Sequence, residues 1–288
     1  MEKKNIDWSN LGFGYISTDK RYVSNYKDGA WDEGVLTEDD KVVISECAGV
    51  LQYAQTIFEG LKAYTTEQGK IVVFRPDLNA ERLEQSALRL EMPAFPRDRF
   101  VEAVVETVKA NAAYVPPYGS GATLYIRPYM FGSSSVIGVK PAEEYQFRIF
   151  CTPVGPYFKG GAKPITIRVS DFDRAAPNGT GHVKAGLNYA MSLHPIVTAH
   201  KEGFDENMYL DLTNKQIMIL NFIKDQLTLK GYPPSVREIG KAVDLKSTAT
   251  VHGYIASLEE KGYIKKESQK GRTLKLLKGG AIEGQEST

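Results

Sequence analysis

Along the first half of the chain, the apolar residues switch between two spacings. Between Ala80 and Leu90 they recur every three or four positions, which predicts a helix with one apolar face and with Asn79 as its N-cap. Short alternating segments surround this helix, and no repeat interrupts them. Such a mixture of strands and helices is typical of an α+β domain, which we assign to residues 1–155.

The clearest alternating segment is ATLYIRPYMF, residues 122–131. Because successive side chains of a strand point to opposite faces, Tyr125, Arg127 and Tyr129 are predicted to share one face. Pro128 has no N–H to donate, so it predicts that the strand lies at an edge of its sheet or near its own end.

A segment rich in Gly and Pro, residues 152–164, is predicted to be an interdomain linker. The residues PITIRVS, which come next, predict a strand that opens a second domain at residues 156–211. Within this domain, the Gly-rich NGTGHVKAG leads into a helix from about Asn188.

The apolar pattern changes again near Asp211. Ser235 and Glu238 form a capping box, which predicts the start of a helix that ends near Asp244. An earlier amphipathic helix is marked by the apolar residues Ile217, Leu220, Ile223 and Leu227.

A third helix is predicted to begin at Ser247 or Thr248 and to end at Gly262. Two short strands around the turn SQKG follow it. Three helices and a hairpin predict a winged helix-turn-helix over residues 212–278, with a flexible tail at residues 279–288. The buried side of the third helix is predicted to contain Val251, Ile255 and Leu258.

Charge separates the two parts of the chain, although the total is only +1. Residues 212–278 contain 13 Lys and Arg against 6 Asp and Glu, which gives this part a net charge of +7. The tail contributes −2 through Glu283 and Glu286, so the first 211 residues have a net charge of −4. This asymmetry favours a nucleic-acid partner for the basic part. A basic solvated surface is the alternative.

Nothing in the sequence predicts a membrane or secreted protein. The apolar runs are short and the N-terminal residues MEKKNIDWSN are polar, so we expect a cytoplasmic protein without a membrane partner. Cys47 and Cys151 lack the paired spacing of a zinc or redox site. We interpret both as buried packing residues and expect no metal.

Four segments of the first 211 residues carry a specific resemblance: TIFEGLKAY, FRPDLNAERL, YIRP and RAAPNGTGHVKAGLNYA. In this order they resemble the signatures of class IV branched-chain aminotransferases, which use pyridoxal 5'-phosphate (PLP). The resemblance implies the small α+β domain of that fold, followed by the start of its large domain. It also implies amino transfer between a branched-chain amino acid and 2-oxoglutarate, and a homodimer.

By this resemblance, Lys184 would bond covalently to the cofactor aldehyde and move a proton during turnover. Tyr189 would hydrogen-bond the phenolic oxygen of the cofactor, and Arg82 would bind its phosphate. From the residues alone, a surface lysine in a glycine loop is the better explanation of Lys184, and a solvated helix charge explains Arg82 equally well. A P-loop is excluded because no Gly-Lys-Ser or Gly-Lys-Thr follows the glycines.

Arg127, between Tyr125 and Tyr129, is the candidate for binding the α-carboxylate of an amino-acid substrate. The alternative is an arginine whose stem covers apolar surface. Glu59 is interpreted as structural. Three residues resemble the apolar wall that favours Leu, Ile and Val side chains, and each would also fit an ordinary core: Phe58, Tyr53 and Tyr157.

The family has a glutamate downstream of Lys184 that pairs with the pyridine nitrogen of the cofactor, and further loops that donate N–H groups to its phosphate. Where those segments should follow ENMYLD, the sequence continues as LTNKQIMIL. We therefore expect a truncated large domain with exposed apolar faces, weakened or lost PLP binding and impaired transamination.

Residues 212–278 carry a second resemblance, in LTNKQ, GYPPSVREI and STATVHGYIASLEEKGYI. These segments resemble the DNA-binding domain of LexA, the repressor of the SOS response. The resemblance implies a domain that binds double-stranded DNA with its third helix in the major groove. The dimerising, self-cleaving domain of LexA is not found, so weak and strongly salt-dependent binding is expected.

The predicted DNA contacts fall into two groups. Small polar side chains at the start of the third helix would contact base edges: Ser247, Thr248, Thr250 and His252. Basic side chains would contact phosphates: Arg237, Lys246, Lys265, Lys266, Lys270 and Arg272. A helix-capping role for Ser247 or Thr248, an exposed position without function for His252, and a protein-interaction module are the alternatives.

Three functions remain open from the sequence. The first is an aminotransferase fragment joined to a repressor's DNA-binding domain, with impaired enzymatic function. The second is a natural transcription repressor that responds to PLP or to an amino acid. The third is an active branched-chain aminotransferase completed by another subunit, which is disfavoured because the missing segments belong to the same domain as Lys184.

Overall fold

The computed structural model describes residues 2–156, 163–170, 172, 174, 179–209, 214–266 and 274–277. It contains two compact units, one of Met1–Arg168 with Arg174–Asn207 and the other of Val169–Asp173 with Met208–Thr288. None of the described helices is long and apolar enough to cross a membrane.

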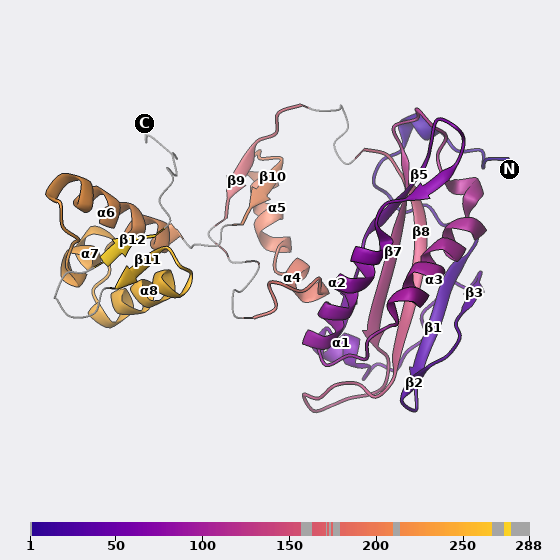
Figure 1. Cartoon of the computed structure of the whole chain (residues 1–288), viewed down its shortest axis with the longest axis horizontal. Helices are drawn as coiled ribbons and strands as arrows, with labels where there is room; N and C mark the ends of the chain where they lie inside the picture. Colours follow the sequence, from indigo (N-terminus) through magenta and orange to yellow (C-terminus); the bar gives the residue numbers. More distant parts are fainter. Residues whose placement is uncertain are drawn as a thin grey trace. The chain divides into compact units, whose positions relative to one another are not determined.

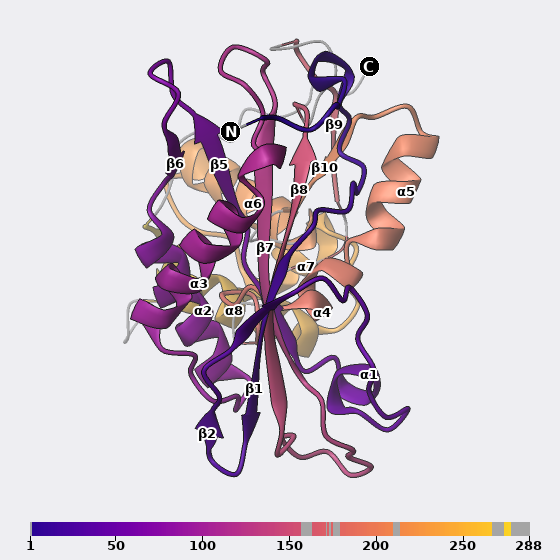
Figure 2. The same ribbon diagram turned by 90° about the vertical axis from the view of Figure 1, so that its right-hand side faces the viewer.

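The first unit is built on a sheet to which eight described strands contribute, in the order β2-β1-β8-β7-β5-β6, with β3 paired to β1 and β4 paired to β7. The two longest strands, β7 and β8, run antiparallel side by side through its centre (Figure 2). The strands are β1 (Arg21–Lys27), β2 (Ala30–Trp31), β3 (Val35–Thr37), β4 (Thr56–Phe58), β5 (Leu61–Thr65), β6 (Ile71–Val73), β7 (Thr123–Gly132) and β8 (Tyr145–Val154).

Two helices, α2 (Pro76–Arg89) and α3 (Arg97–Ala110), pack on one face of this sheet (Figure 1). The core lies between them and the strands, and its fully buried side chains include Leu83, Phe100, Ile126, Phe147 and Ile149. Three shorter helical segments flank the sheet: η1 (Trp8–Asn10), α1 (Gly49–Tyr53) and η2 (Ala112–Tyr114). The alternation predicted for β7 is confirmed, because its odd-numbered side chains from Tyr125 to Tyr129 are only half-buried on the other face.

The prediction that Asn79 caps α2 is wrong. The helix begins at Pro76, after Arg75 in a left-handed conformation with φ of 46°, and Pro76 suits the first helical position because no N–H is needed there. The Asn79 side chain instead donates to Glu59 Oε2 at 2.7 Å.

The prediction that Pro128 lies at an edge or near a strand end is also wrong, because Pro128 is in the middle of β7, and β7 has neighbouring strands on both sides. One neighbour is β8, where Pro128 is paired with Ile149. On the other side β4 ends at Phe58 and β5 begins at Leu61, so no strand is paired there with Pro128. The Glu59 N–H donates to the Pro128 carbonyl at 2.7 Å. Pro128 has no N–H to donate, and it lies at the gap between the short strands β4 and β5.

The described residues that follow form β9 (Ile167–Val169), α4 (Gly186–Ala190), α5 (Leu193–Lys201) and β10 (Glu206–Met208). The strand and helix predicted here are therefore present, with the helix starting two residues before Asn188. The predicted linker begins too early, since β8 continues to Val154. Cys151 is buried as predicted, whereas Cys47 is only half-buried.

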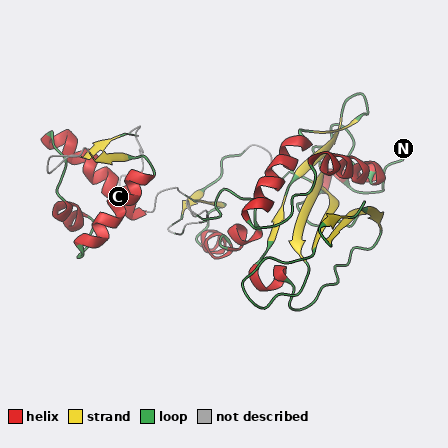
Figure 3. Ribbon diagram, turned by 60° about the horizontal axis from the view of Figure 1, so that its bottom comes forward, coloured by secondary structure: helices red, strands yellow, loops and turns green. Residues whose placement is uncertain are grey.

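The second unit contains α6 (Asn214–Lys230), α7 (Val236–Ala242), α8 (Thr248–Glu260) and a hairpin of β11 (Ile264–Lys266) and β12 (Leu274–Leu276). Figure 3 shows the three helices packed around the two short strands. The capping box of Ser235 and Glu238 is confirmed, and so is the start of α8. Its core consists of Ile219, Leu220, Ile223, Ile239, Val243, Val251, Ile255, Leu258 and Ile264.

Candidate functional site

The loop that carries Lys184 is fastened to the first sheet by its backbone. Ala185 forms an antiparallel bridge with Ile57, and the Phe58 N–H donates to the Lys184 carbonyl at 3.1 Å. On the other side, the Lys184 N–H donates to Ser86 Oγ of α2 at 3.1 Å. The lysine backbone is thus held between the end of β4 and one face of α2.

Asn188 closes the same loop from within. Its buried side-chain amide donates to the carbonyls of Thr180 at 2.7 Å and Val183 at 2.8 Å, and it accepts from Thr180 Oγ1 at 3.0 Å. Because these hydrogen bonds satisfy a buried amide, they fix the conformation of the chain segment that contains Lys184.

Four side chains gather around the ring of Phe58, and together with it we call them the Phe58 cluster: Phe58, Tyr125, Arg127, Lys184 and Tyr189. The Lys184 Nζ and the Arg127 guanidinium each lie 4.6 Å from the centre of the Phe58 ring. Lys184 Nζ donates to Tyr189 Oη at 2.8 Å, and Arg127 Nε donates to Tyr125 Oη at 2.9 Å. The cluster therefore combines two cations and two phenols around one apolar ring.

The phenol of Tyr189 is the most perturbed group of the cluster. Partial burial raises its pKa, but hydrogen bonds and charges from Lys184 and Arg174 outweigh this and bring the pKa below the ordinary value of 10.0. The Arg174 guanidinium lies 4.4 Å from the centre of the Tyr189 ring. A phenol under two positive charges is a strong hydrogen-bond donor.

Arg82 lies at the edge of the cluster and forms a two-point ion pair with Glu59. Its Nε and one Nη are 2.6 Å and 2.7 Å from the carboxylate oxygens of Glu59, which is fully buried. The hydrogen bond to Glu59 raises the pKa of Arg82, and a smaller contribution in the same direction comes from Tyr189. Glu59 thus fixes the direction of the Arg82 side chain.

One residue of the predicted apolar wall, Tyr53, does not join this cluster. The hydroxyl of Tyr53, on α1, donates to the carbonyl of Ile137, and among the described residues Tyr53 shares no ring contact or hydrogen bond with the cluster. Tyr157 lies outside the described residues.

Sequence reasoning missed Arg174, Ser86 and Asn188. Arg174 and Asn188 belong to a motif that the resemblance already used, RAAPNGTGHVKAGLNYA, so their membership of that motif was an available signal. Ser86 lies one helical turn after Arg82, and this i, i+4 spacing was the only clue that both face the lysine loop.

In the second unit, the predicted base-contacting residues lie together at the start of α8. Ser247, Thr248, Thr250 and His252 are all exposed, while Val251 between them is buried. The Ser247 hydroxyl accepts from the Thr250 N–H at 3.4 Å, so its helix-capping role is observed. Gly253 on the same exposed side leaves the helix backbone bare, with nothing within 4 Å of its Cβ position.

Of the predicted phosphate contacts, Arg237, Lys246 and Lys265 are exposed. Lys266 is on β11, and its side chain is not among those described. Lys270 and Arg272 lie outside the described residues.

Comparison with known protein families agrees with this division. The family model for class IV amino-transferases matches residues 56–218, which is more than half of the chain. The chain belongs to the class IV aminotransferase family. The model for the LexA DNA binding domain matches residues 209–273, so the two matches overlap at the junction and the same chain carries a LexA-type domain.

Among curated relatives of this class IV aminotransferase chain is the branched-chain-amino-acid aminotransferase of Haemophilus influenzae, 52% identical over 208 residues. The match covers 72% of this chain and 61% of the relative, so the chain spans about three fifths of the length of that enzyme.

Two solved structures are similar. The Escherichia coli branched-chain amino acid aminotransferase has a TM-score of 0.56 and 27% identity over 68% of this chain and 60% of its own. The branched-chain aminotransferase of the thermophilic archaeon Thermoproteus uzoniensis, solved with norvaline, has a TM-score of 0.51 and 27% identity over 66% of this chain and 60% of its own.

Proposed function

We propose that the first unit retains the PLP-binding lysine site of a branched-chain aminotransferase and that the second unit binds specific DNA sequences. The observation that carries the first part is the convergence of Lys184, Tyr189, Arg127 and Tyr125 around Phe58. Kinship with the branched-chain enzymes supports a branched-chain amino acid and a 2-oxo acid such as 2-oxoglutarate as the substrates.

The side chains of this site are suited to PLP, which has an aldehyde, a phenolic oxygen and a phosphate. Lys184 offers an amine for the aldehyde, and Tyr189 offers a donor for the phenolic oxygen. Arg82 brings positive charge close to Tyr189 for the phosphate, although two of its N–H groups are already committed to Glu59. When bound, PLP would withdraw electrons from the substrate α-carbon.

The remaining roles follow from the chemistry of the cluster. Arg127, oriented by Tyr125, would bind the substrate carboxylate, because a planar guanidinium offers two parallel N–H donors. Lys184 would take the proton from the substrate α-carbon, and its Nζ is positioned by the hydrogen bond to Tyr189 Oη. Phe58 would keep water from the amine.

We further propose that transamination is impaired. Efficient electron withdrawal by PLP needs a carboxylate at its pyridine nitrogen. From the family resemblance, we expect this carboxylate downstream of Lys184. The described carboxylates that follow Lys184 in the first unit have other partners: Glu202 pairs with Arg168 at 2.7 Å, Asp205 accepts from Thr166 at 2.7 Å, and Glu206 accepts from the Asn207 N–H at 2.9 Å. The match to the aminotransferase model ends at residue 218, and the match to the LexA domain continues to residue 273.

Mixing the full chain with PLP tests the lysine assignment. We expect a shift of the PLP absorbance band and, after borohydride reduction, a covalent PLP mass on the peptide containing Lys184. Lys184→Ala should abolish both, whereas Lys201→Ala, an exposed lysine on α5, should keep both. An absorbance shift that persists in Lys184→Ala, or a mass on another lysine, would refute the proposal.

For the second unit, we propose that α8 reads DNA bases and that Arg237, Lys246 and Lys265 bind phosphates, as in a transcription repressor. The exposed polar start of α8 on a self-contained core supports this, together with the net charge of +7. DNA binding accounts for small polar side chains next to Gly253, which has open space at its Cβ position, whereas a protein-interaction surface would not require them.

A gel shift titrated with salt tests the DNA proposal. Lys246→Ala should weaken binding to all sequences and reduce the salt slope by about one unit, since each lost phosphate contact releases about one counterion fewer. Thr250→Ala should instead weaken sequence preference at one or two base pairs. Lys109→Ala, on α3 of the first unit, serves as the control. Equal binding to all sequences by the wild-type chain would exclude specific reading.

A further inference from the structure

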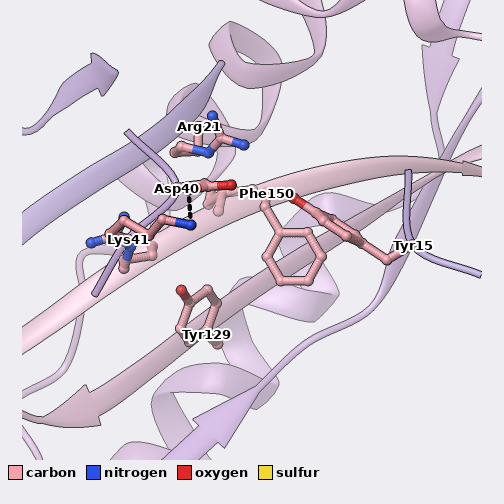
Figure 4. Close-up of a pocket in the computed structure, with 8 residues that line it drawn as sticks. Tyr15, Arg21, Asp40, Lys41, Tyr129 and Phe150 are labelled. Atoms are coloured by element: carbon pink, nitrogen blue, oxygen red, sulfur yellow. Dashed lines mark ion pairs between the residues drawn. The ribbon is translucent and has the colours of Figure 1, made fainter. Parts of the chain in front are cut away.

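A cavity lies on the open face of the first sheet, opposite α2 and α3. Its volume is about 360 Å³, within the range of small-molecule sites. Side chains from β1, β7, β8 and the segment after β3 surround it (Figure 4). Its lining consists of Tyr15, Arg21, Asp40, Lys41, Tyr129, Arg148, Ile149 and Phe150.

Two arginines in this lining are buried without a carboxylate partner. Arg21 is 4% exposed and Arg148 is 7% exposed, and neither forms an ion pair within the described part of the chain. They come from the neighbouring strands β1 and β8, where Arg148 is paired with Val23. Removing a guanidinium from water is costly unless an opposite charge compensates it, so two such groups beside one cavity call for an anion.

The hydrogen bonds of the two arginines do not supply that charge. Arg21 donates to the carbonyls of Glu38 at 2.6 Å and Thr18 at 3.3 Å, and to Ser17 Oγ at 3.4 Å. Arg148 donates to the Asp39 carbonyl and to Gln146 Oε1, both at 3.4 Å. These neutral acceptors hold the 38–41 segment over the cavity. The pKa of Asp40 is lowered first by its hydrogen bond to Lys41, with which this carboxylate is already paired, and the charge of Arg21 also helps to lower it.

The other charged groups at the cavity are Lys41 and Asp40, which pair with each other at 3.2 Å (Figure 4). Three cations therefore face one carboxylate. Burial raises the pKa of Tyr129 despite the nearby Arg148, so its phenol stays a donor at neutral pH. Phe150, in edge contact with the rings of Tyr15 and Tyr129, gives the cavity an apolar wall.

We propose that this cavity binds a small organic dianion, either a dicarboxylate or a phosphate ester, with its charged groups on Arg21, Arg148 and Lys41 and its carbon skeleton against Phe150. The excess of two positive charges matches a dianion. The aromatic wall favours an organic body over a bare inorganic ion. This site is separate from the Phe58 cluster and does not depend on its proposed function.

Calorimetric titration of the full chain with succinate, in chloride buffer of constant ionic strength, tests the proposal. We expect saturable binding that Arg148→Gln weakens at least tenfold. Lys41→Ala should weaken it several-fold, and because 78% of the Lys41 side chain is exposed, this variant keeps the fold even where Arg148→Gln does not. Lys109→Ala should bind like the wild type. A parallel titration with glycerol phosphate distinguishes the two ligand classes. Tighter binding of glycerol phosphate would assign a phosphate ester, and tighter binding of succinate would assign a dicarboxylate.

Three results would overturn the proposal. One is absence of binding by either probe. Another is binding that Arg148→Gln and Lys41→Ala leave unchanged. The third is binding lost in Arg127→Gln but kept in Arg148→Gln, which would assign the anion to the Phe58 cluster.

Discussion

At the scale of single residues, the lysine site depends on long-range contacts of charged side chains. Glu59 and Arg82 are 23 positions apart, and Arg174 approaches Tyr189 from across a loop. The resemblance indicated Lys184, Tyr189 and Arg127 as candidates because motifs carry residue identity. It gave no pairing for Glu59, because an ion pair between distant segments follows from the fold and has no local periodicity.

The lowered pKa of Tyr189 leads to a prediction about pH. Of the 16 tyrosines, Tyr189 should ionise earliest in an ultraviolet titration of the phenolate band, below 10.0, and Tyr189→Phe should remove this early step. Because the folded state loses this proton before the unfolded state does, the first unit should gain stability as pH rises from the lowered pKa towards 10.0. Lys184→Met should move the step back upwards, and an unchanged titration in that variant would contradict the proposed cause.

At the scale of elements, the sequence predicted the helices of the second unit well because each has an apolar stripe and because α7 and α8 have N-caps. Ser235 with Glu238 and Ser247 are local signals, and all three are observed as caps. The first unit was harder to predict. Pro128 lies inside β7 because the gap between β4 and β5 accepts a residue without an N–H, and that gap depends on two other segments.

Two glycines of the second unit form a matched pair for a stability prediction. Gly253→Ala should stabilise α8 by about 0.5–1 kcal/mol, since alanine is the better helix former and its Cβ meets nothing within 4 Å. Gly240→Ala should destabilise by about 1–3 kcal/mol, because its Cβ would come within 2.9 Å of the Leu245 carbonyl oxygen.

Hydrogen exchange of α8 peptides in the full chain measures both effects. Tryptophan fluorescence would not, because Trp8 and Trp31 both belong to the first unit. Slower exchange in Gly253→Ala together with weaker DNA binding would add support for close approach of DNA to this face. Destabilisation by Gly253→Ala would contradict the helix-propensity argument.

At the scale of the whole molecule, the chain matches two different family models, one over residues 56–218 and one over residues 209–273. We propose that the boundary lies near residue 212, between the aminotransferase part, with domains at 1–155 and 156–211, and the DNA-binding domain. The core of the second unit is contributed entirely by residues from Ile219 to Ile264, which supports independent folding.

Limited proteolysis with mass mapping tests this boundary. A stable fragment that begins near Leu212 and contains Ile264 is expected at low protease concentration, because exposed junctions between cores are cleaved first. Simultaneous loss of both units, or a first cut inside α6, would show that the two parts do not fold separately.

The bridge between Ile57 and Ala185 has a consequence for protein engineering. It joins two segments that are distant in the sequence, so a fragment must contain both of them for the backbone of Lys184 to be held by β4. We therefore expect that the shortest fragment able to present Lys184 in this way extends from Thr56, where β4 begins, to Asn188, whose side chain closes the lysine loop.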